Sequence, residues 1–364
     1  MDNENKTVDT EIKSDTSLKK KEKHHSFGTC LKAAVHENRF VLLAALCTAL
    51  IMMVVYYCYD LFPFGEVTIL RMDLYHQYGP LYSEFYDRIT SGGSLLYSWN
   101  TGGGSSFLGN FLNYVSSPFT ILMLIFGHKN MPEAIAAIIL LKAATASFTC
   151  AYYFKKSQKV NNPSIAAFGV LYACCGFFIA YYWNVMWLDA FYLLPLIALG
   201  IEKLINERRM KLYFFSLILA ALTNYYMAYM LCIFSVLYFL AYYFGHYALS
   251  ETYFGKLAKS TEKNYIKNIF IRLVRNIRNS RLLDSGIRFA FTAVGAVLSC
   301  AFILIPLYYI LNACSATSGT WPQDWKTYFS VFDFLANHVA YLEPTIRSSG
   351  TDVLPNIYCG VLPL

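Results

Sequence analysis

Long apolar segments separated by short basic loops constrain this chain more than any other feature. The segments begin at Phe40 and recur as far as Leu311, and most run for about 20 residues, the length that an α-helix needs to cross a bilayer. Charged residues make up only 15% of the 364 residues, whereas soluble domains carry roughly a quarter. The sequence therefore predicts an all-α polytopic membrane protein rather than a chain folded around one large soluble core.

We expect three regions along the chain. Residues 1–39 are polar and basic and have no signal-peptide cleavage motif, which predicts a disordered cytoplasmic tail. Residues 40–311 are predicted to form a transmembrane helical bundle that includes an external loop over 60–132. Residues 312–364 are predicted to form an external region leading into a further, truncated span. About seven spans are predicted in the bundle, at residues 40–59, 133–154, 163–182, 185–202, 209–224, 226–248 and 288–311.

The distribution of Lys and Arg orients these helices. If the N-terminus is cytoplasmic, 24 of the 30 Lys and Arg fall in segments predicted to be cytoplasmic, five fall in external segments, and Lys142 alone lies in a span. Cytoplasmic loops are enriched in Lys and Arg, so the bias predicts a multi-pass cell-membrane protein with a cytoplasmic N-terminus. The net charge of +7 is then explained as a topology signal of the cytoplasmic side that also contacts anionic lipid, and no nucleic-acid partner is expected.

The ten cysteines do not form a metal-binding or redox motif. No Cys-x-x-Cys occurs, and most of the cysteines lie in apolar segments, where they pack as small hydrophobic residues. Cys314 and Cys359 both fall on the predicted external side, which leaves a disulfide between them open.

The external loop is predicted to contain structure of its own. Apolar residues recur at helical spacing from Leu74 to Ile89 with charged residues between them, the pattern of an amphipathic helix in the membrane interface. The Gly-rich stretch 99–106 is predicted to be irregular. Residues 118–126 are apolar but too short to span, which indicates a re-entrant or interfacial piece.

Residues 71–80 at the start of this loop concentrate polar side chains. Asp73 is suited to act as a base toward an acceptor hydroxyl or to hold a divalent cation, and His76, three residues further on, would share a helix face with it for an acid/base step. Arg71, Tyr75 and Gln77 are predicted to contact the substrate. The alternative is structural: a solvated loop in which Asp73 caps a helix.

Asp189 lies near the outer end of a predicted span, where a carboxylate is costly unless it faces a cavity or a partner. Lys142 enters the membrane from the same side. We expect an ion pair between the two, and favour it over a catalytic role, with Asp189 still facing the cavity and contacting the substrate.

Two further groups have two interpretations each. Asn224 and Tyr225 form either a plain turn between two helices or a polar and aromatic lining for a sugar or head group. Trp99 and Asn100 adjoin the run of glycines and belong either to a loop that closes over a substrate or to a passive linker. A nucleotide phosphate loop is excluded because no strand is predicted before the glycines and the segment is predicted to be external.

Five stretches follow one another along the chain: Asp73-Leu-Tyr-His-Gln-Tyr-Gly-Pro80, Trp99-Asn-Thr-Gly-Gly-Gly104, Tyr114-x-x-Ser-Pro118, Trp187-Leu-Asp-Ala190 with Leu194-Pro-Leu196, and Leu222-Thr-Asn-Tyr-Tyr-Met227. Together they cover most of residues 40–311 and resemble the bacterial membrane protein YfhO family. Members of that family are usually longer, so the resemblance implies an N-terminal portion or an unusually short member.

The YfhO family is similar to the GT-C class of membrane glycosyltransferases, so the resemblance implies a GT-C-like helical bundle with interfacial helices in the first external loop. That class carries an acidic residue in this loop, a position that Asp73 matches. Tyr75 stands where the class often has a second acid, so the resemblance does not imply a tightly held metal, and Asp73 is the residue that would contact a divalent cation if one binds.

The resemblance implies an enzyme that moves a sugar from a polyprenyl-phosphate carrier, such as undecaprenyl phosphate, to an extracellular cell-wall polymer such as lipoteichoic acid. A separate synthase and flippase would supply the donor. The alternatives are a polytopic transporter or lipid flippase, which would distribute polar residues through the membrane depth, and a scaffold for cell-wall assembly.

Overall fold

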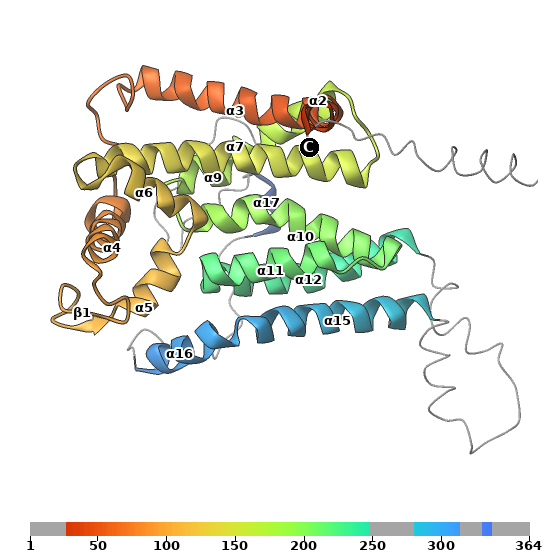
Figure 1. The fold of residues 1–364 in the computed structure, drawn as a ribbon. Helices are drawn as coiled ribbons and strands as arrows, with labels where there is room; N and C mark the ends of the chain where they lie inside the picture. The colour runs from red at the N-terminus through yellow and green to blue at the C-terminus, as the bar shows by residue number, and fades with distance from the viewer. Residues whose placement is uncertain (1–26, 248–279, 314–329, 337–364) are drawn as a thin grey trace, which may run out of the picture.

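Helices make up nearly all the regular structure of the computed structural model, which describes residues 27–247, 280–313 and 330–336 (Figure 1). The prediction of an all-α polytopic membrane protein is confirmed. Sheet structure in the described residues is limited to an isolated bridge between Leu61 and Val67 and a short antiparallel pair, β1 (Tyr97–Ser98) with β2 (Ser105–Ser106). The predicted spans correspond to α3 (Arg39–Cys58), α7 (Met131–Ser157), α8 (Pro163–Ala173) with α9 (Gly176–Tyr181), α10 (Trp187–Glu207), α11 (Lys211–Thr223), α12 (Tyr225–His246) and α15 (Arg281–Ser299).

Five helical segments are long and apolar enough to cross a membrane on their own. They are Arg39–Cys58, His128–Ser157, Pro163–Tyr181, Tyr225–His246 and Arg281–Ser299. Two other predicted spans are less apolar or shorter: α10 has 21 residues but carries four charged ones, and α11 has only 13. The segment that contains α7 lies at the centre of the bundle, because 67% of its apolar 18-residue stretch is buried, against 17–39% in the other four segments.

Successive helices run in opposite directions between two ends of the bundle. The C-terminal end of α7 meets the N-terminal end of α3, since Lys155 Nζ donates to the Glu37 carbonyl oxygen over 2.6 Å. Figure 1 shows the whole of the predicted external loop gathered at the opposite end. The loops at 158–162 and 208–210 lie at the first end, as the charge distribution predicts. They contain or adjoin seven Lys and Arg residues: Lys155, Lys156, Lys159, Lys203, Arg208, Arg209 and Lys211.

Two boundaries differ from the predictions. Residues 27–37, predicted to be disordered, form α2 (Phe27–Glu37), because Leu, Lys and Ala favour helix in its centre. The span predicted over 288–311 begins earlier, at Arg281, and is two helices that meet at Cys300, α15 and α16 (Ala301–Asn312). Pro306 lies inside α16, where it leaves the carbonyl of Phe302 without its usual helical donor.

The helix α10 tolerates an internal proline because another helix compensates for it. Pro195 leaves the carbonyl of Phe191 without its usual helical donor. The Tyr172 hydroxyl donates to that carbonyl over 2.6 Å. At Gly200 the backbone of α11 approaches so closely that a Cβ atom would lie 2.6 Å from the Tyr213 nitrogen, so Gly is required for this packing.

The external loop forms a cap of short helices. A π-helical turn, η1 (Leu74–Tyr78), leads into α4 (Gly79–Ser91), and Leu74, Tyr78 and Leu81 are buried as the amphipathic pattern predicts. Figure 1 shows α4 nearly end-on while the long helices lie in the plane of the picture, so α4 crosses the end of the bundle. The remaining pieces are α5 (Phe107–Asn110), η2 (Phe111–Val115), η3 (Pro118–Thr120), α6 (Ile121–Phe126) and η4 (His128–Asn130).

The segment from 107 to 126 is the re-entrant piece expected around Pro118. Residues Phe107–Val115 and Pro118–Phe126 form two arms that bend by 98°. The chain enters and leaves this pair at the same end of the bundle (Figure 1), and Ser117 at the bend is buried. The Gly-rich loop is a small hairpin rather than wholly irregular, and Gly102, Gly103 and Gly104 have positive φ angles that its turn requires.

The last region lies mostly outside the described residues. Between 314 and 364 only residues 330–336, which include α17 (Val331–Ala336), are described, so the predicted further span and the pairing of Cys314 with Cys359 lie outside the described residues. The predicted tail over residues 1–26 lies outside them too.

Candidate functional site

Asp73 is exposed at the N-terminal end of η1, immediately beside the end of the bundle. Its side chain makes no capping hydrogen bond to that turn, so the capping interpretation is not what the structure shows. The hydroxyl of Tyr78 lies beside Asp73: the pKa of Tyr78 is raised first by burial and then by the negative charge of Asp73. Tyr78 therefore stays protonated, while the Asp73 carboxylate keeps capacity for a ligand.

An apolar cavity of about 780 Å³ opens on one side of this segment, and we call it the outer groove. Arg71 carries the only formal charge among the described residues that line it, and its Nη1 donates to the Tyr182 hydroxyl over 3.3 Å. The groove therefore combines a hydrocarbon-like wall with a cation at its polar edge. Its lining includes residues of the segment 59–71 together with side chains from the C-terminal half of α3 and from α9: Ile51, Met52, Val55, Tyr56, Phe178 and Ile179.

A second cavity, of about 450 Å³, lies beside η1 and α4 and is strongly polar; we call it the polar pocket. It brings together three residues predicted for the site, His76, Gln77 and Asn100, although Asn100 is more than twenty residues away in the sequence. Glu84 and Asp87 of α4 also line it. From the sequence, these two carboxylates are predicted only to lie on the polar face of an amphipathic helix.

Two stacked tyrosines, Tyr78 and Tyr114, link the residues of the polar pocket to the bundle. Tyr78 stacks on Tyr114 with ring centroids 5.2 Å apart, and its hydroxyl donates to Asn184 Oδ1 over 2.9 Å. Gln77 Nε2 donates to the Tyr114 hydroxyl over 3.0 Å. Sequence reasoning missed Tyr114 and Asn184 as site residues, although Tyr114 belongs to one of the stretches on which the family resemblance rests.

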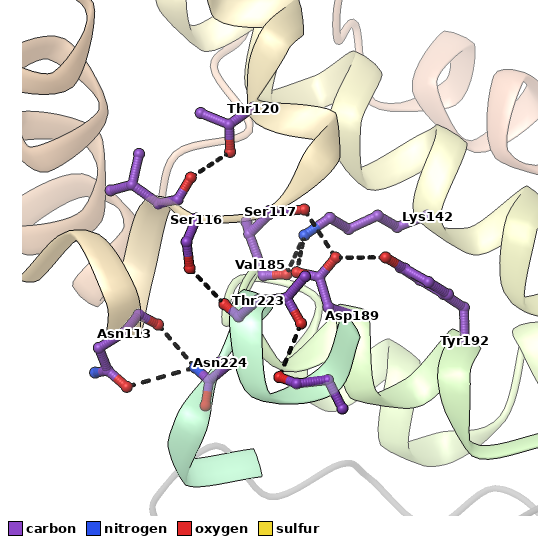
Figure 2. A network of polar contacts seen from close by, with 12 residues as sticks. Asn113, Ser116, Ser117, Thr120, Lys142, Val185, Asp189, Tyr192, Thr223 and Asn224 are labelled. Atoms are coloured by element: carbon purple, nitrogen blue, oxygen red, sulfur yellow. Dashed lines mark hydrogen bonds and ion pairs between the residues drawn. The ribbon is translucent and has the colours of Figure 1, made fainter. Parts of the chain in front are cut away.

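Asp189 and Lys142 form the predicted ion pair, with Lys142 Nζ 2.6 Å from Asp189 Oδ2 and both side chains 0% exposed. Figure 2 shows the pair inside a larger network. Ser117 and Tyr192 donate to Asp189 Oδ1 over 2.8 and 3.0 Å, and Lys142 also donates to the Val185 carbonyl oxygen over 2.9 Å. The prediction that Asp189 also faces a cavity is wrong, because its own partners enclose the carboxylate completely.

Asn224 is likewise enclosed. Its side-chain oxygen accepts from the Met227 nitrogen over 2.8 Å and caps α12, while its Nδ2 donates to the Asn113 carbonyl oxygen over 2.7 Å (Figure 2). Ser116 Oγ donates to the Thr223 carbonyl oxygen over 2.9 Å. These hydrogen bonds connect the re-entrant piece to the α11–α12 turn. The geometry therefore favours the interpretation of Asn224 as a turn residue over its interpretation as a lining residue for a sugar or head group.

The remaining predicted residues lie apart from one another. Trp99 is 76% exposed and packs edge-on against Tyr97. Tyr75 is 58% exposed and packs edge-on against His76. Tyr225 is half-buried at the start of α12. Trp99 and Tyr75 thus offer open aromatic faces at the end of the bundle that carries residues 60–132, and substrate contact by Trp99, Tyr75 and Tyr225 stays a prediction.

Within the described residues, no group of three or more His, Cys, Asp and Glu side chains is arranged to hold a metal ion. Asp73 is the residue predicted to hold a cation if one binds, and it would need ligands from the substrate, such as phosphate oxygens.

The helices, the re-entrant piece and the helical cap define a multi-pass membrane protein with an open polar cluster at one end of its bundle. The model of the bacterial membrane protein YfhO family matches residues 44–364, so the chain belongs to that family. No curated protein matches the chain. No solved structure matches it either.

Proposed function

We propose that this YfhO protein is a membrane glycosyltransferase that takes a sugar from a polyprenyl-phosphate carrier and adds it to an extracellular cell-wall polymer such as lipoteichoic acid. One observation carries the proposal: the segment 71–77 adjoins an apolar groove edged by Arg71 and a polar pocket lined by His76 and Gln77. A lipid-linked donor needs an apolar channel and a cation, and a sugar acceptor needs a polar pocket.

The donor's isoprenoid tail would lie in the outer groove with its phosphate at Arg71. The residues Ile51 to Tyr59 cover about 12 Å along α3, given a rise of about 1.5 Å per residue, so the groove holds the part of the tail nearest the phosphate. Tyr182, already bonded to Arg71, would help to hold the phosphate oxygens.

Asp73 lies two residues from Arg71, where the sugar attached to the donor phosphate would lie. It would take the proton from the acceptor hydroxyl as the hydroxyl oxygen attacks the anomeric carbon and the lipid phosphate leaves. His76 would assist the proton transfer, and Gln77 and Asn100 would orient the acceptor in the polar pocket. The rate enhancement would come mainly from positioning and from stabilising the leaving phosphate.

The orientation of the protein belongs to the same proposal. The basic loops would face the cytoplasm together with the N-terminus, and the cap that carries Asp73 would face the outside. The donor would reach that side through a separate synthase and flippase, because the sequence contains no motif for a nucleotide-linked sugar.

The test is sugar transfer by the purified full chain in liposomes that contain a radiolabelled polyprenyl-phosphate-linked hexose and isolated cell-wall polymer. We expect Asp73→Asn to lower transfer at least about 100-fold. Asp60→Asn is the matched control, because Asp60 is also an exposed carboxylate of the predicted external loop but lies outside the segment 71–77 that adjoins both cavities. Donor translocation without transfer would favour a transporter, and wild-type transfer by Asp73→Asn would remove Asp73 from the chemistry.

A further inference from the structure

We infer, on the basis of the proposed function, that the hairpin of β1 and β2 binds a sugar ring of the acceptor polymer next to the unit held in the polar pocket. Trp99 is the main contact, and with Tyr97 it forms what we call the aromatic platform. Trp99 then belongs neither to a mobile loop that closes over a substrate nor to a passive linker.

The two faces of the hairpin differ in what they contact. Successive side chains of a strand point to opposite faces, and Ser98 is 0% exposed between Tyr97 and Trp99, which are 44% and 76% exposed. Ser98 Oγ donates to Glu84 Oε1 over 2.5 Å and accepts from the Asn100 nitrogen over 3.0 Å. One face is therefore held against α4, while the other presents two aromatic rings.

Further contacts fix both ends of the hairpin. Arg88 of α4 pairs with Glu84 over 2.6 Å, and its Nη1 also donates to the Ser94 carbonyl oxygen. The Arg88 guanidinium lies 4.5 Å from the centre of the Phe107 ring, and the Phe107 nitrogen donates to the Leu96 carbonyl oxygen over 3.0 Å. The platform is thus ordered before a ligand binds, which lowers the entropy cost of binding.

Gly104 allows the two rings to lie together. Its φ is +128°, and a Cβ atom there would collide with the Tyr97 hydroxyl and lie 3.2 Å from Trp99 Cε3. The rings pack edge-on with centroids 5.0 Å apart. Single exposed hydrophobic residues are ordinary, but here the chain uses a glycine to set an open indole against a second ring. Such a rigid aromatic face suits the C–H face of a sugar ring, which leaves the hydroxyls of the sugar in water.

The position of the platform indicates which sugar it binds. The residues that follow Trp99 are Asn100, Thr101 and Gly102, and all three line the polar pocket. Consecutive Cα atoms lie about 3.8 Å apart, so the platform begins at the rim of the pocket. Figure 1 shows β1 at the margin of the cap, beyond the ends of α3 and α15, which favours a polymer in water over lipid as the partner.

Stacking recognises the face of a ring rather than a charge. The platform therefore fits a polymer that carries sugars on either a glycosidic or a phosphodiester backbone. A polymer whose accepting unit occupies the pocket places a neighbouring sugar on Trp99, whereas a single sugar cannot occupy both positions.

The experiment measures kcat and KM for isolated cell-wall polymer in the liposome assay, and the labelled polymer that sediments with the proteoliposomes when no donor is present. Trp99→Ala should raise the KM about tenfold, weaken sedimentation by a similar factor and leave kcat unchanged. Trp99→Phe should recover part of the loss, since Phe keeps a ring face. A methyl hexoside, which fills only the pocket, should have the same KM in the wild type and in Trp99→Ala.

Tyr309→Ala is the matched control. Tyr309 lies in α16, is 69% exposed and packs edge-on against the neighbouring Tyr308, as Trp99 does against Tyr97. We expect its KM and its polymer binding to equal those of the wild type. Equal losses in Tyr309→Ala and Trp99→Ala would assign Trp99 to the membrane interface and overturn the inference.

Wild-type KM and polymer binding in Trp99→Ala would also overturn the inference, while leaving the glycosyltransferase proposal in place. Absence of transfer by the wild type would contradict the proposed function, whereas polymer sedimentation that depends on Trp99 would still support the platform. If Trp99→Ala does not insert into the membrane, Trp99→Gln provides a second variant without a ring.

Discussion

Two polar clusters lie toward the end of the bundle that carries residues 60–132, and they differ in whether their carboxylates are enclosed or exposed. Around Asp189 the carboxylate is enclosed by Lys142, Ser117 and Tyr192. Around Asp73 the carboxylate is exposed and makes no capping bond. Because buried charges are tolerated only when they are fully paired, we interpret the first cluster as building the site and the second as binding the substrate.

The enclosed cluster has a position that suits this structural role. Ser117 connects Asp189 of α10 to the bend of the re-entrant piece, and Asn224 connects the α11–α12 turn to Asn113 on one of its arms. The same arm carries Tyr114, which contacts both Tyr78 and Gln77 of the open cluster. The enclosed cluster therefore fixes the surface against which the open cluster is arranged.

The largest expected effect is on stability. Lys142→Met should lower the free energy of unfolding by about 3–5 kcal/mol, because it leaves Asp189 charged and unpaired in the interior. The double variant Lys142→Met, Asp189→Leu should recover most of that loss. Reversible unfolding in mixed micelles measures both values. Equal losses in the single and double variants would show that the pair does not act as a unit.

A smaller loss is expected at the turn that anchors the re-entrant piece. Asn224→Ala should cost about 1–2 kcal/mol, since it removes the cap of α12 and the contact with Asn113. Asn224→Asp keeps the cap oxygen but places a buried, unpaired carboxylate oxygen against the Asn113 carbonyl oxygen, so it should cost more than the alanine variant. The same unfolding experiment checks the order, and Asn161→Ala, an exposed residue at the other end, serves as the control.

The open cluster should respond in activity rather than in stability. Arg71→Ala should raise the KM for the lipid-linked donor about tenfold, the value of one exposed charge-assisted contact of roughly 1.4 kcal/mol. The KM of Arg71→Lys should lie between those of the wild type and Arg71→Ala, because Lys keeps the positive charge but lacks the planar guanidinium group. An unchanged KM in Arg71→Ala would place the donor phosphate elsewhere.

The smallest expected effect concerns Tyr78. Tyr78→Phe should cost about 0.5–1.5 kcal/mol through the lost bond to Asn184. Burial and Asp73 raise the pKa of Tyr78, so its contribution to stability is complete below about pH 10 and is lost as the pH rises further. The phenylalanine variant should therefore lose less stability than the wild type above about pH 10, as thermal unfolding at several pH values would show.

The sequence was most informative where burial leaves few choices. The pair of Lys142 and Asp189 could be predicted because each residue lies in an apolar segment and needs a partner of opposite charge. The buried face of residues 74–81 followed from helical spacing. The hydroxyl partners Ser117 and Tyr192 could not be predicted, because a hydroxyl in an apolar segment also satisfies itself on its own helix.

The site was harder to predict where it depends on contacts between distant segments. Glu84 and Asp87 looked like the solvent face of a helix, and only the fold of the Gly-rich hairpin against α4 makes them part of a pocket. Tyr114 could have been singled out, since it lies in a motif that ends in Ser117-Pro118. Asn184 offered no local signal, because its role comes from a hydroxyl 106 residues away.

The most direct measurement compares Asp73→Asn with Asp189→Asn on two readouts, the free energy of unfolding and the rate of sugar transfer. We predict that Asp73→Asn unfolds within about 0.5 kcal/mol of the wild type yet loses at least about 100-fold in transfer. Asp189→Asn should lose about 3–5 kcal/mol of stability. Wild-type transfer by Asp73→Asn, or wild-type stability of Asp189→Asn, would contradict the assignment of binding to the open cluster and of structure to the enclosed one.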